Sequence, residues 1–263
     1  MKRRTLLHLT AAWMTAAALT SSVRPLSAAP LTAPVDRAGD HAVDLALVLA
    51  IDSSASITDG DMAFQLRGHA AAFRNPRIRN AVASGVHGAI AVIAVQWSGP
   101  NTTGVLIPWT RLASPADAEH FAATLEHVSG SARIDSTAIG SAIQQATALF
   151  DRIPWPADRQ IIDLCSNGFS NSGIDPTGPR DAAVARGIGI NAVVILDEYD
   201  WLEQYYQENV IGGPGAFVRV AESRDSFADA ILEKLATEIA GIAASIRLGG
   251  IAADPVGETT GDA

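Results

Sequence analysis

The chain is poor in cysteine and in charged residues. Cys165 is its one cysteine, which excludes an intramolecular disulfide and any zinc site built from several thiolates. Charged residues make up 18% of the 263 residues and hydrophobic residues 48%, a balance that excludes general disorder and allows a sizeable core. A Walker loop is missing, and the six histidines show no His-Glu-x-x-His spacing, which argues against a catalytic zinc site.

Long hydrophobic segments are also missing, apart from one at the start of the chain. Residues 1–29 have the pattern of a secretory signal peptide, with a basic start at positions 2–4, an apolar segment over 6–19 and small residues at 27–29. The pair Arg3-Arg4 is compatible with twin-arginine export as well as with the Sec route. We therefore expect an exported protein, either periplasmic or secreted.

Removal of the signal peptide changes the charge of the chain. Four positive residues and no negative ones leave with it, so the net charge moves from −9 to about −13. Such an acidic domain is a poor partner for nucleic acid. No later segment has about 20 unbroken apolar residues, so no membrane span is expected after signal removal. We expect a linker over 30–40, a folded domain over 41–243 and a flexible C-terminal tail over 244–263.

Between these ends the pattern alternates strands and helices, which predicts an α/β domain. Strands are expected at residues 43–51, 88–97, 105–109, 160–165, 188–196 and 217–220. Helices are expected from Thr58 to Asn75, over 114–127, 137–150, 180–186 and 201–208, and in a last helix capped by Ser226. The second and third strands are joined by a short turn, so they are expected to be antiparallel.

Three loops rich in oxygen groups follow predicted strands or open a predicted helix. They are Asp52-x-Ser54-x-Ser56, Asp135-Ser136-Thr137 and Ser166-Asn167-Gly168. In an open α/β sheet, ligands bind at the carboxyl ends of the strands. Carboxylate and hydroxyl oxygens at every second residue suit a hard cation such as Mg2+. The simpler alternative is that Ser54 and Ser56 only cap the following helix.

With these motifs in place, the chain resembles the von Willebrand factor type A (vWA) superfamily, whose metal-ion-dependent adhesion site (MIDAS) joins Asp-x-Ser-x-Ser, a distant threonine and an Asp-Gly pair. The resemblance covers roughly residues 43–240 and is strongest to a bacterial family of exported members, through the stretches 43–52, 96–99 and 108–110. It implies a single doubly wound domain with a six-stranded, mostly parallel sheet. One short edge strand would be antiparallel, and helices would cover both faces.

Transferred position by position, the resemblance implies metal ligands at Asp52, Ser54, Ser56 and Thr137. The third motif departs from the family, because Asn167-Gly168 stands where the family has Asp-Gly. An amide brings no negative charge, so affinity for Mg2+ or Mn2+ should be lower than in the family. Asp135 and Asp163 are candidate compensating carboxylates, although Asp163 is expected to lie inside the preceding strand.

The resemblance further implies recognition, not catalysis, with a carboxylate of a protein partner completing the coordination of the metal. Two alternatives stay open: a metal-free scaffold, favoured by Asn167, and a hydrolase that uses the same crevice. The acidic and aromatic segment 197–206 would suit partner contact if it is exposed near the metal, or else forms a helix docked through Trp201 and Tyr205. Cys165 is expected to be a buried small hydrophobe.

Overall fold

The computed structural model describes residues 42–130 and 135–249, without the side chains of Arg224 and 242–249. The expected signal peptide at 1–29 and linker at 30–40 lie outside the described residues. The expected tail at 244–263 is described only in part, because the last helix runs on to Gly249. None of the helices within the described ranges is long and apolar enough to cross a bilayer.

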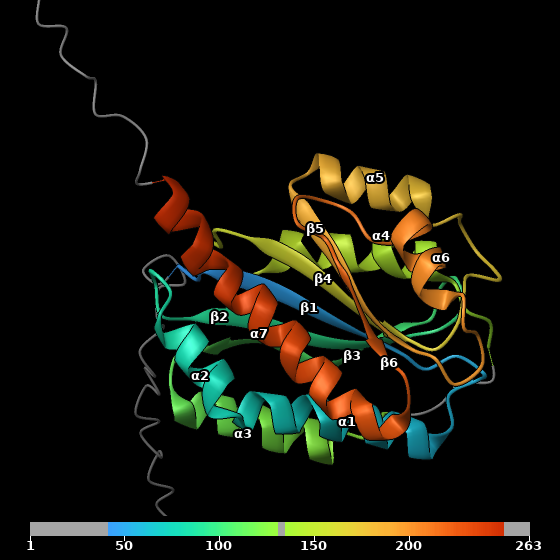
Figure 1. Cartoon of the computed structure of the whole chain (residues 1–263), viewed down its shortest axis with the longest axis horizontal. Coiled ribbons are helices and arrows are strands. Elements are labelled where there is room, and N and C mark those ends of the chain that lie inside the picture. Colours follow the sequence, from blue (N-terminus) through green and yellow to red (C-terminus); the bar gives the residue numbers. More distant parts are fainter. Residues whose placement is uncertain (1–41, 131–134, 250–263) are drawn as a thin grey trace, which may run out of the picture. The chain divides into compact units, whose positions relative to one another are not determined.

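Six strands in the described part of the chain form one sheet in the order β3-β2-β1-β4-β5-β6 (Figure 1). Their bounds are Leu45–Asp52 for β1, Ile90–Trp97 for β2, Thr103–Leu112 for β3, Gln160–Ser166 for β4, Ile188–Ile195 for β5 and Val218–Ala221 for β6. Only β2 and β3 pair antiparallel. The predicted α/β class, with a mostly parallel six-stranded sheet and one antiparallel edge strand, is confirmed.

The antiparallel edge strand β3 is longer than the predicted 105–109. It runs for 10 residues, and its register with β2 shifts on both sides of Ala94. Pro108 lies in this irregular part of β3 and has no pairing partner on β2. Proline is tolerated at such a position because an edge strand with a bulge does not need every backbone N–H. The strand therefore continues through a residue that would end it in the middle of a sheet.

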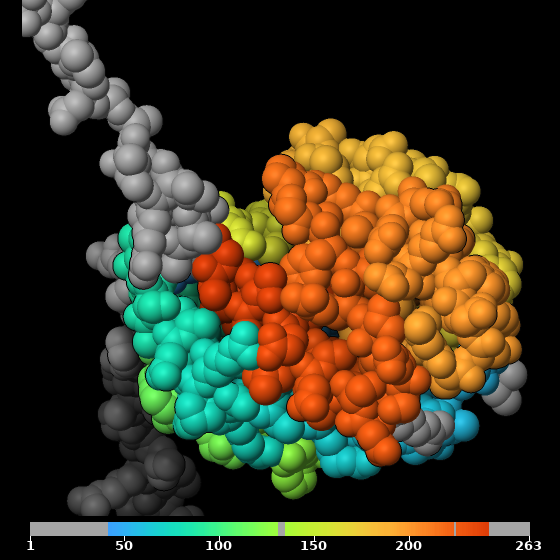
Figure 2. All heavy atoms as spheres, viewed as in Figure 1, coloured from blue at the N-terminus to red at the C-terminus, as the bar shows by residue number. Residues whose placement is uncertain are grey.

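Helices cover both faces of the sheet (Figure 1). One face carries α1 (Asp59–Arg74), α2 (Pro76–Ala83), α3 (Pro115–His127) and α7 (Arg224–Gly249). The other carries α4 (Ile139–Leu149), α5 (Thr177–Ala185) and α6 (Leu202–Asn209), with a 3-10 turn at Phe150–Arg152 after α4. In the space-filling view α7 lies between α2 and β6 (Figure 2). This is the doubly wound arrangement expected from the sequence.

Two of the helix starts follow from local hydrogen bonds. Thr58 and Asp61 form the expected capping box at the start of α1. Asn75 ends α1 and its side chain caps α2, a helix that the sequence analysis did not predict. The predicted cap of the last helix is wrong, because α7 begins at Arg224 and Ser226 lies in its first turn. There its hydroxyl bonds back to the backbone of Ser223.

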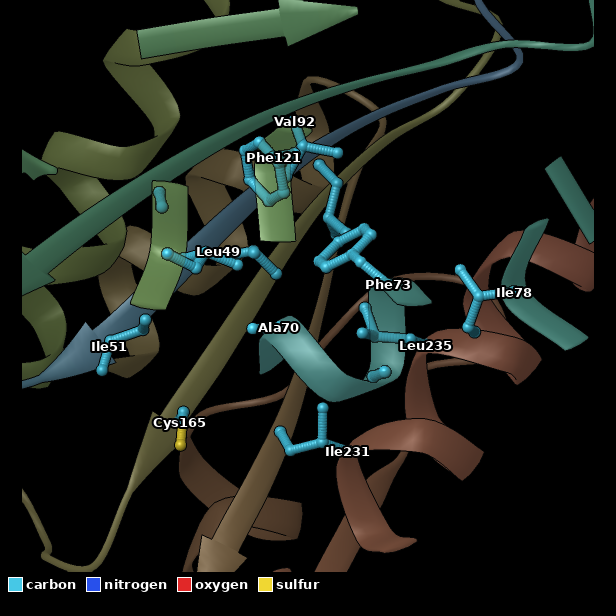
Figure 3. Packing of buried hydrophobic residues seen from close by; sticks show 14 of the residues in the cluster. Leu49, Ile51, Ala70, Phe73, Ile78, Val92, Phe121, Cys165, Ile231 and Leu235 are labelled. Atoms are coloured by element: carbon cyan, nitrogen blue, oxygen red, sulfur yellow. The ribbon is translucent and has the colours of Figure 1, made fainter. Parts of the chain in front are cut away.

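The core is divided between the two faces by the alternation of side chains along β1. Leu47 and Leu49 belong to the cluster under α1, α3 and α7, and Val48 belongs to the cluster under α4, α5 and α6. Phe73 of α1 and Phe121 of α3 meet edge to face, with their ring centroids 5.0 Å apart (Figure 3). These layers fix the carboxyl ends of the strands in place, and the loops of interest leave from those ends.

The α7 face also buries a charged group, which we call the α7 network: Asp163, Lys234, Glu238 and Asn191. The side chains of Lys234, Asp163 and Glu238 have no exposed surface. The Lys234 ammonium pairs with Asp163 of β4 and lies 2.6 Å from a Glu238 oxygen, which also accepts a 2.8 Å bond from Asn191 of β5. Pairing is what makes such burial tolerable, and it ties α7 to two central strands.

Candidate metal site at the carboxyl ends of the strands

The strand order reverses between β1 and β4, the two central strands of the sheet. From β1 the chain proceeds to β2 and β3 on one side, and it later returns to β4 and continues to β5 and β6 on the other. The loops after β1 and β4 therefore diverge and leave a crevice between them, which is where open α/β sheets bind ligands. Asp52 is the last residue of β1 and Ser166 the last of β4.

Asp52 is fully buried, and two donors hold its carboxylate. Its Oδ1 accepts a 2.7 Å bond from the backbone N–H of Ser54, and its Oδ2 accepts a 2.5 Å bond from the hydroxyl of Ser166. Burial raises the pKa of Asp52, and the bonds from Ser166 and Ser54 oppose that shift. The carboxylate is thus fixed in direction by its neighbours in both diverging loops.

The two serines of the first motif converge with Asn167. The hydroxyl oxygens of Ser54 and Ser56 are 3.5 Å apart, and the Ser56 hydroxyl donates a 2.8 Å bond to the side-chain oxygen of Asn167. The Asn167 amide nitrogen faces Asp197 at 3.4 Å. Neither serine bonds the start of α1, where Thr58 is the cap. The capping alternative for Ser54 and Ser56 is therefore wrong.

Thr137 borders the same place from the loop before α4. Its backbone N–H donates to the side chain of Asn171 at 2.9 Å, and its hydroxyl lies 3.6 Å from the position that a Cβ on Gly168 would take. Among the described residues, no hydrogen bond uses the Thr137 hydroxyl. The structure thus brings four predicted ligands, Ser54, Ser56, Thr137 and Asn167, to the loops around Asp52.

The two candidate compensating carboxylates lie in different places. Asp135 accepts bonds from the N–H of Ser136 at 2.7 Å and the hydroxyl of Thr102 at 3.0 Å, which keep its pKa below the usual range. Its backbone oxygen accepts from Ala55, so it braces the first loop beside the crevice. Asp163 lies inside β4, as expected, and its carboxylate pairs with Lys234 in the α7 network instead of facing the crevice loops.

A pocket of about 490 Å3 opens beside these residues. Its lining includes Ser56, Thr137, Gly168, Phe169, Glu198 and Tyr199. Phe169 packs against Tyr199, Trp201 and Tyr205 at centroid distances of 5.4, 5.3 and 6.3 Å. Trp201 remains 44% exposed. The aromatic segment thus forms a packed cluster of rings next to the pocket, and its contact with a partner stays a prediction.

The contacts of three residues in this region were not predicted from the sequence. Ser166 bonds Asp52, and Tyr206 donates a 3.1 Å bond to the backbone oxygen of Gly168, with burial raising the pKa of its phenol well above the usual value. Gln65 of α1 accepts a 3.0 Å bond from the thiol of Cys165 and lies 3.4 Å from the backbone oxygen of Asp52. Cys165 is buried, as predicted, and its thiol pKa is raised by burial. The position of Ser166 directly after the predicted strand 160–165 was the signal available for its role.

A second cluster lies at the opposite, amino-terminal ends of the strands. Asp44, His87 and Asp158 precede β1, β2 and β4, and each offers one ligand atom within 4.8 Å of the others. His87 Nε2 is 3.1 Å from Asp158, while both Asp44 oxygens accept backbone N–H groups, from His87 at 2.9 Å and Ala89 at 3.2 Å. Asp44 thus anchors the turn before β2, and no sequence spacing signalled this group.

The donors at the crevice fit a hard divalent cation. Those that converge there are oxygens: one carboxylate, three hydroxyls and one amide, from Asp52, Ser54, Ser56, Thr137 and Asn167. Oxygen-only sets select Mg2+, Mn2+ or Ca2+ over soft metals. The single carboxylate implies weak binding, because affinity rises with the charge of the ligand set.

Two solved structures with TM-scores above 0.5 support the fold. A zinc-occupied MIDAS form of proximal thread matrix protein 1 from mussel byssus aligns with a TM-score of 0.55 and 16% identity, over 76% of this chain and 49% of that one. The pilus adhesin SpaC from Lactobacillus rhamnosus GG, in an open conformation, gives 0.54 and 15%, over 77% and 30%. A von Willebrand factor type A protein from Catenulispora acidiphila gives 0.48 and 16%, over 75% and 43%. The chain spans less than half the length of each of these three proteins.

Comparison of the sequence with known families and with curated proteins gives one family. A search of curated proteins gives no match. The model of the family described as "Protein of unknown function (DUF1194)" matches residues 42–243, which is most of the chain. The fold predicted from the resemblance is confirmed by this match and by the sheet order. The chain belongs to the DUF1194 family and has a vWA-like α/β fold.

Proposed function

We propose that this protein is an exported recognition module that binds Mg2+ or Mn2+ in the crevice and captures a carboxylate of a protein partner. The single observation that carries the proposal is the convergence of Ser54, Ser56 and Asn167 beside the fixed carboxylate of Asp52. These residues come from two loops, with Ser56 and Asn167 111 positions apart, and Ser56 among them also lines an open pocket.

Each candidate ligand would make its own contribution to the metal site. Asp52 supplies the charge, and its bonds from Ser54 N–H and Ser166 hold the carboxylate in one orientation. The hydroxyls of Ser54, Ser56 and Thr137 and the oxygen of Asn167 supply neutral ligands. A divalent cation held by so little negative charge stays electrophilic and attracts an additional carboxylate.

The partner contact would extend to the pocket rim. Phe169, Tyr199 and Trp201 present aromatic surface next to the crevice, and aromatic rings are enriched at protein interfaces. No described residue of the loops at 53–58, 98–102, 135–138, 167–176 or 196–201 is Lys or Arg, whereas Asp135, Asp175, Asp197, Glu198 and Asp200 are acidic. This acidic rim repels an incoming carboxylate unless a cation offsets it, so capture should depend on the metal.

A metal-free scaffold is the competing candidate, and one contact favours it. The Ser56 hydroxyl already donates to Asn167 at 2.8 Å, so the two loops close on each other through their own hydrogen bond. In that case the crevice would bind its partner through the aromatic rim alone, with no dependence on chelators.

Isothermal titration of the mature protein with Mg2+ and with Mn2+ distinguishes the two candidates. The proposal expects saturable binding that is lost in a Ser54→Ala/Ser56→Ala double variant. Affinity capture from the native envelope, with and without EDTA, then tests the partner. Absence of metal binding together with EDTA-independent capture would overturn the proposal in favour of the metal-free scaffold.

A further inference from the structure

The residue that departs from the vWA motif is followed by glycine. Asn167-Gly168 is the one Asn-Gly pair in the sequence. In such a pair the backbone nitrogen of the glycine can attack the side-chain carbonyl carbon of the asparagine, because glycine has no Cβ to hinder the approach. The resulting five-membered imide releases ammonia and is then hydrolysed, so that asparagine becomes aspartate.

The hydrogen bonds around Asn167 match the needs of this reaction. The attacking nitrogen, Gly168 N, donates a 3.1 Å bond to the hydroxyl of Ser166, which in turn donates to Asp52 at 2.5 Å. This chain of two bonds leads the proton of the nucleophile toward a carboxylate. General-base assistance of this kind requires hydrogen-bond reach, and the geometry supplies it.

The side-chain oxygen and nitrogen of Asn167 also have polar neighbours. The Ser56 hydroxyl donates to the Asn167 carbonyl oxygen at 2.8 Å, which stabilises negative charge on that oxygen as the carbon becomes tetrahedral. The departing nitrogen, Nδ2, faces the carboxylate of Asp197 at 3.4 Å. Gly168 lines the open pocket, so water reaches the site of hydrolysis.

We propose that Asn167 is a self-modification site, which the folded protein deamidates to aspartate with the help of Ser166 and Asp52. In the first step, the bond from Gly168 N to Asn167 Cγ forms and the bond from Cγ to Nδ2 breaks. The Gly168 proton passes to Ser166 as the Ser166 proton passes to Asp52, and Nδ2 takes a proton from water and leaves as ammonia. In the second step, the hydroxide left from that water attacks Cγ, the imide bond to Gly168 N opens, and Gly168 N takes back the proton from Asp52 through Ser166. The net change is asparagine plus water to aspartate plus ammonia, with no oxidation.

The product would have an Asp-Gly pair after β4, as in the vWA motif. The same Ser56 bond that activates Cγ for the first step directs water to Cγ in the second, which favours aspartate over the isoaspartate that forms when water attacks the backbone carbonyl. The proposed conversion concerns Asn167 alone and does not require metal binding. Its benefit for metal binding rests on the proposed function, and the two are tested separately.

The experiment follows the mass of the peptide that contains residue 167. The purified mature protein is incubated at mildly alkaline pH in ordinary water and in water enriched in 18O, digested, and compared with a synthetic peptide of residues 160–173. The expected result is replacement of the amide by a carboxyl group that carries one solvent oxygen, faster in the folded protein than in the peptide. Retention of the amide in the folded protein, while the peptide loses it, would overturn the proposal.

Two variants separate assistance by the fold from the intrinsic reactivity of Asn-Gly. Ser166→Ala keeps the Asn-Gly pair and breaks the proton path, so its deamidation should be slower by about tenfold or more. Gly168→Ala should nearly stop the reaction, and the fold should accept it because the new Cβ would only make ordinary contacts of 3.6 Å with Thr137. The neighbouring Asn171-Ser172 pair serves as an internal control that should keep its amide. A Ser166→Ala variant that reacts as fast as the wild type contradicts the proposed role of Ser166.

Failure of this test and failure of the metal proposal have different signatures. The mass change is measured without metal, so it is independent of any cation. An encoded Asn167→Asp variant, in turn, reports on metal binding when it is compared with protein whose Asn167 amide is shown by mass to be intact.

Discussion

The hydroxyl of Ser166 donates a 2.5 Å hydrogen bond to a carboxylate oxygen of Asp52, across 114 positions of sequence. The two residues end neighbouring parallel strands, β4 and β1, at the point where the loops diverge. The other oxygen of Asp52 accepts the N–H of Ser54 at 2.7 Å. Because both oxygens have donors inside the protein, Asp52 contributes to stability as well as to the candidate site.

Replacing Asp52 with asparagine should therefore have two effects. Loss of the carboxylate should abolish binding of Mg2+ or Mn2+ in isothermal titration. The new amide NH2 group would also face a donor, Ser54 N–H or Ser166, so the free energy of unfolding in urea should fall by about 1–3 kcal/mol.

Ser53→Ala is the matched control. Ser53 is the next residue, is equally buried, and donates a 3.0 Å bond to the backbone of Trp97 outside the crevice. Its loss should lower stability by about 1 kcal/mol and leave metal binding intact. If Asp52→Asn bound metal as the wild type does, Asp52 would not be a ligand.

Replacing Asn167 with aspartate should strengthen metal binding. The side-chain oxygen of Asn167 already lies 2.8 Å from Ser56, so an isosteric carboxylate would add a negative charge with little change of shape. We expect at least about a tenfold lower Kd for Mg2+ than in wild-type protein whose Asn167 amide is shown by mass to be intact, equivalent to ~1.4 kcal/mol, measured by titration calorimetry.

Asn171→Asp tests whether any new charge has this effect. Asn171 lines the same pocket, and its side-chain oxygen accepts the N–H of Thr137, a role that an aspartate can keep. It should change the affinity far less than Asn167→Asp does. Equal gains from both variants would indicate general electrostatic attraction in place of a ligand at position 167.

The convergence at the crevice was predictable because it follows from topology. The apolar run before Asp52 and the run before Ser166 have the length of buried parallel strands, and parallel strands place their carboxyl ends at one edge. Thr58 and Asp61 have the spacing of a capping box, which depends on residues three positions apart. Local patterns and strand direction were sufficient for these features.

Contacts that depend on side-chain packing were not predictable in the same way. Lys234 and Glu238 flank the apolar stripe of α7, and charged residues are ordinarily exposed, yet both are buried against β4 and β5. The group of Asp44, His87 and Asp158 comes from three distant segments with no fixed spacing. Helix α2 was not predicted, because the pair Asn75-Pro76 is typical of the end of a helix. Proline is equally suited to the first turn of a new helix, which is its place in α2.

Gly140 should be irreplaceable because of the close approach of a loop to α4. A Cβ at this position would lie 2.2 Å from the backbone oxygen of Ile174, so Gly140→Ala must push the 174–175 loop away. We expect a loss of roughly 1–3 kcal/mol in the free energy of unfolding, as for overpacking of a rigid contact. Gly178 in α5 is the control, since nothing lies within 4 Å of its Cβ position. Gly178→Ala should stabilise the protein by about 0.5–1 kcal/mol, because alanine is the better helix former.

Stability should depend on pH through Glu238. Burial raises the pKa of Glu238 to about 7, although Lys234 favours its charged form. In the unfolded chain its pKa is about 4.3. Between these values the folded state holds a proton that the unfolded state has lost, so the stabilisation is complete below about pH 4 and is lost as the pH rises through about 7. His69 acts in the opposite direction, because burial lowers its pKa to about 4 and the unfolded state takes up the proton first.

The contribution of Glu238 is isolated by comparing the wild type with Glu238→Gln. The glutamine mimics the protonated acid and keeps the surroundings, which include Lys234, Asp163 and the Arg159 guanidinium bonded to the Glu238 backbone oxygen. Between about pH 5 and 8, urea unfolding should show the wild type losing roughly 2–3 kcal/mol relative to the variant. Glu233→Gln, on the exposed side of α7 beside Arg77, should give a difference that does not change with pH in this range, because pairing lowers the pKa of Glu233. Parallel pH curves for the wild type and Glu238→Gln would mean that Glu238 is ionised in the folded protein throughout, held charged by Lys234.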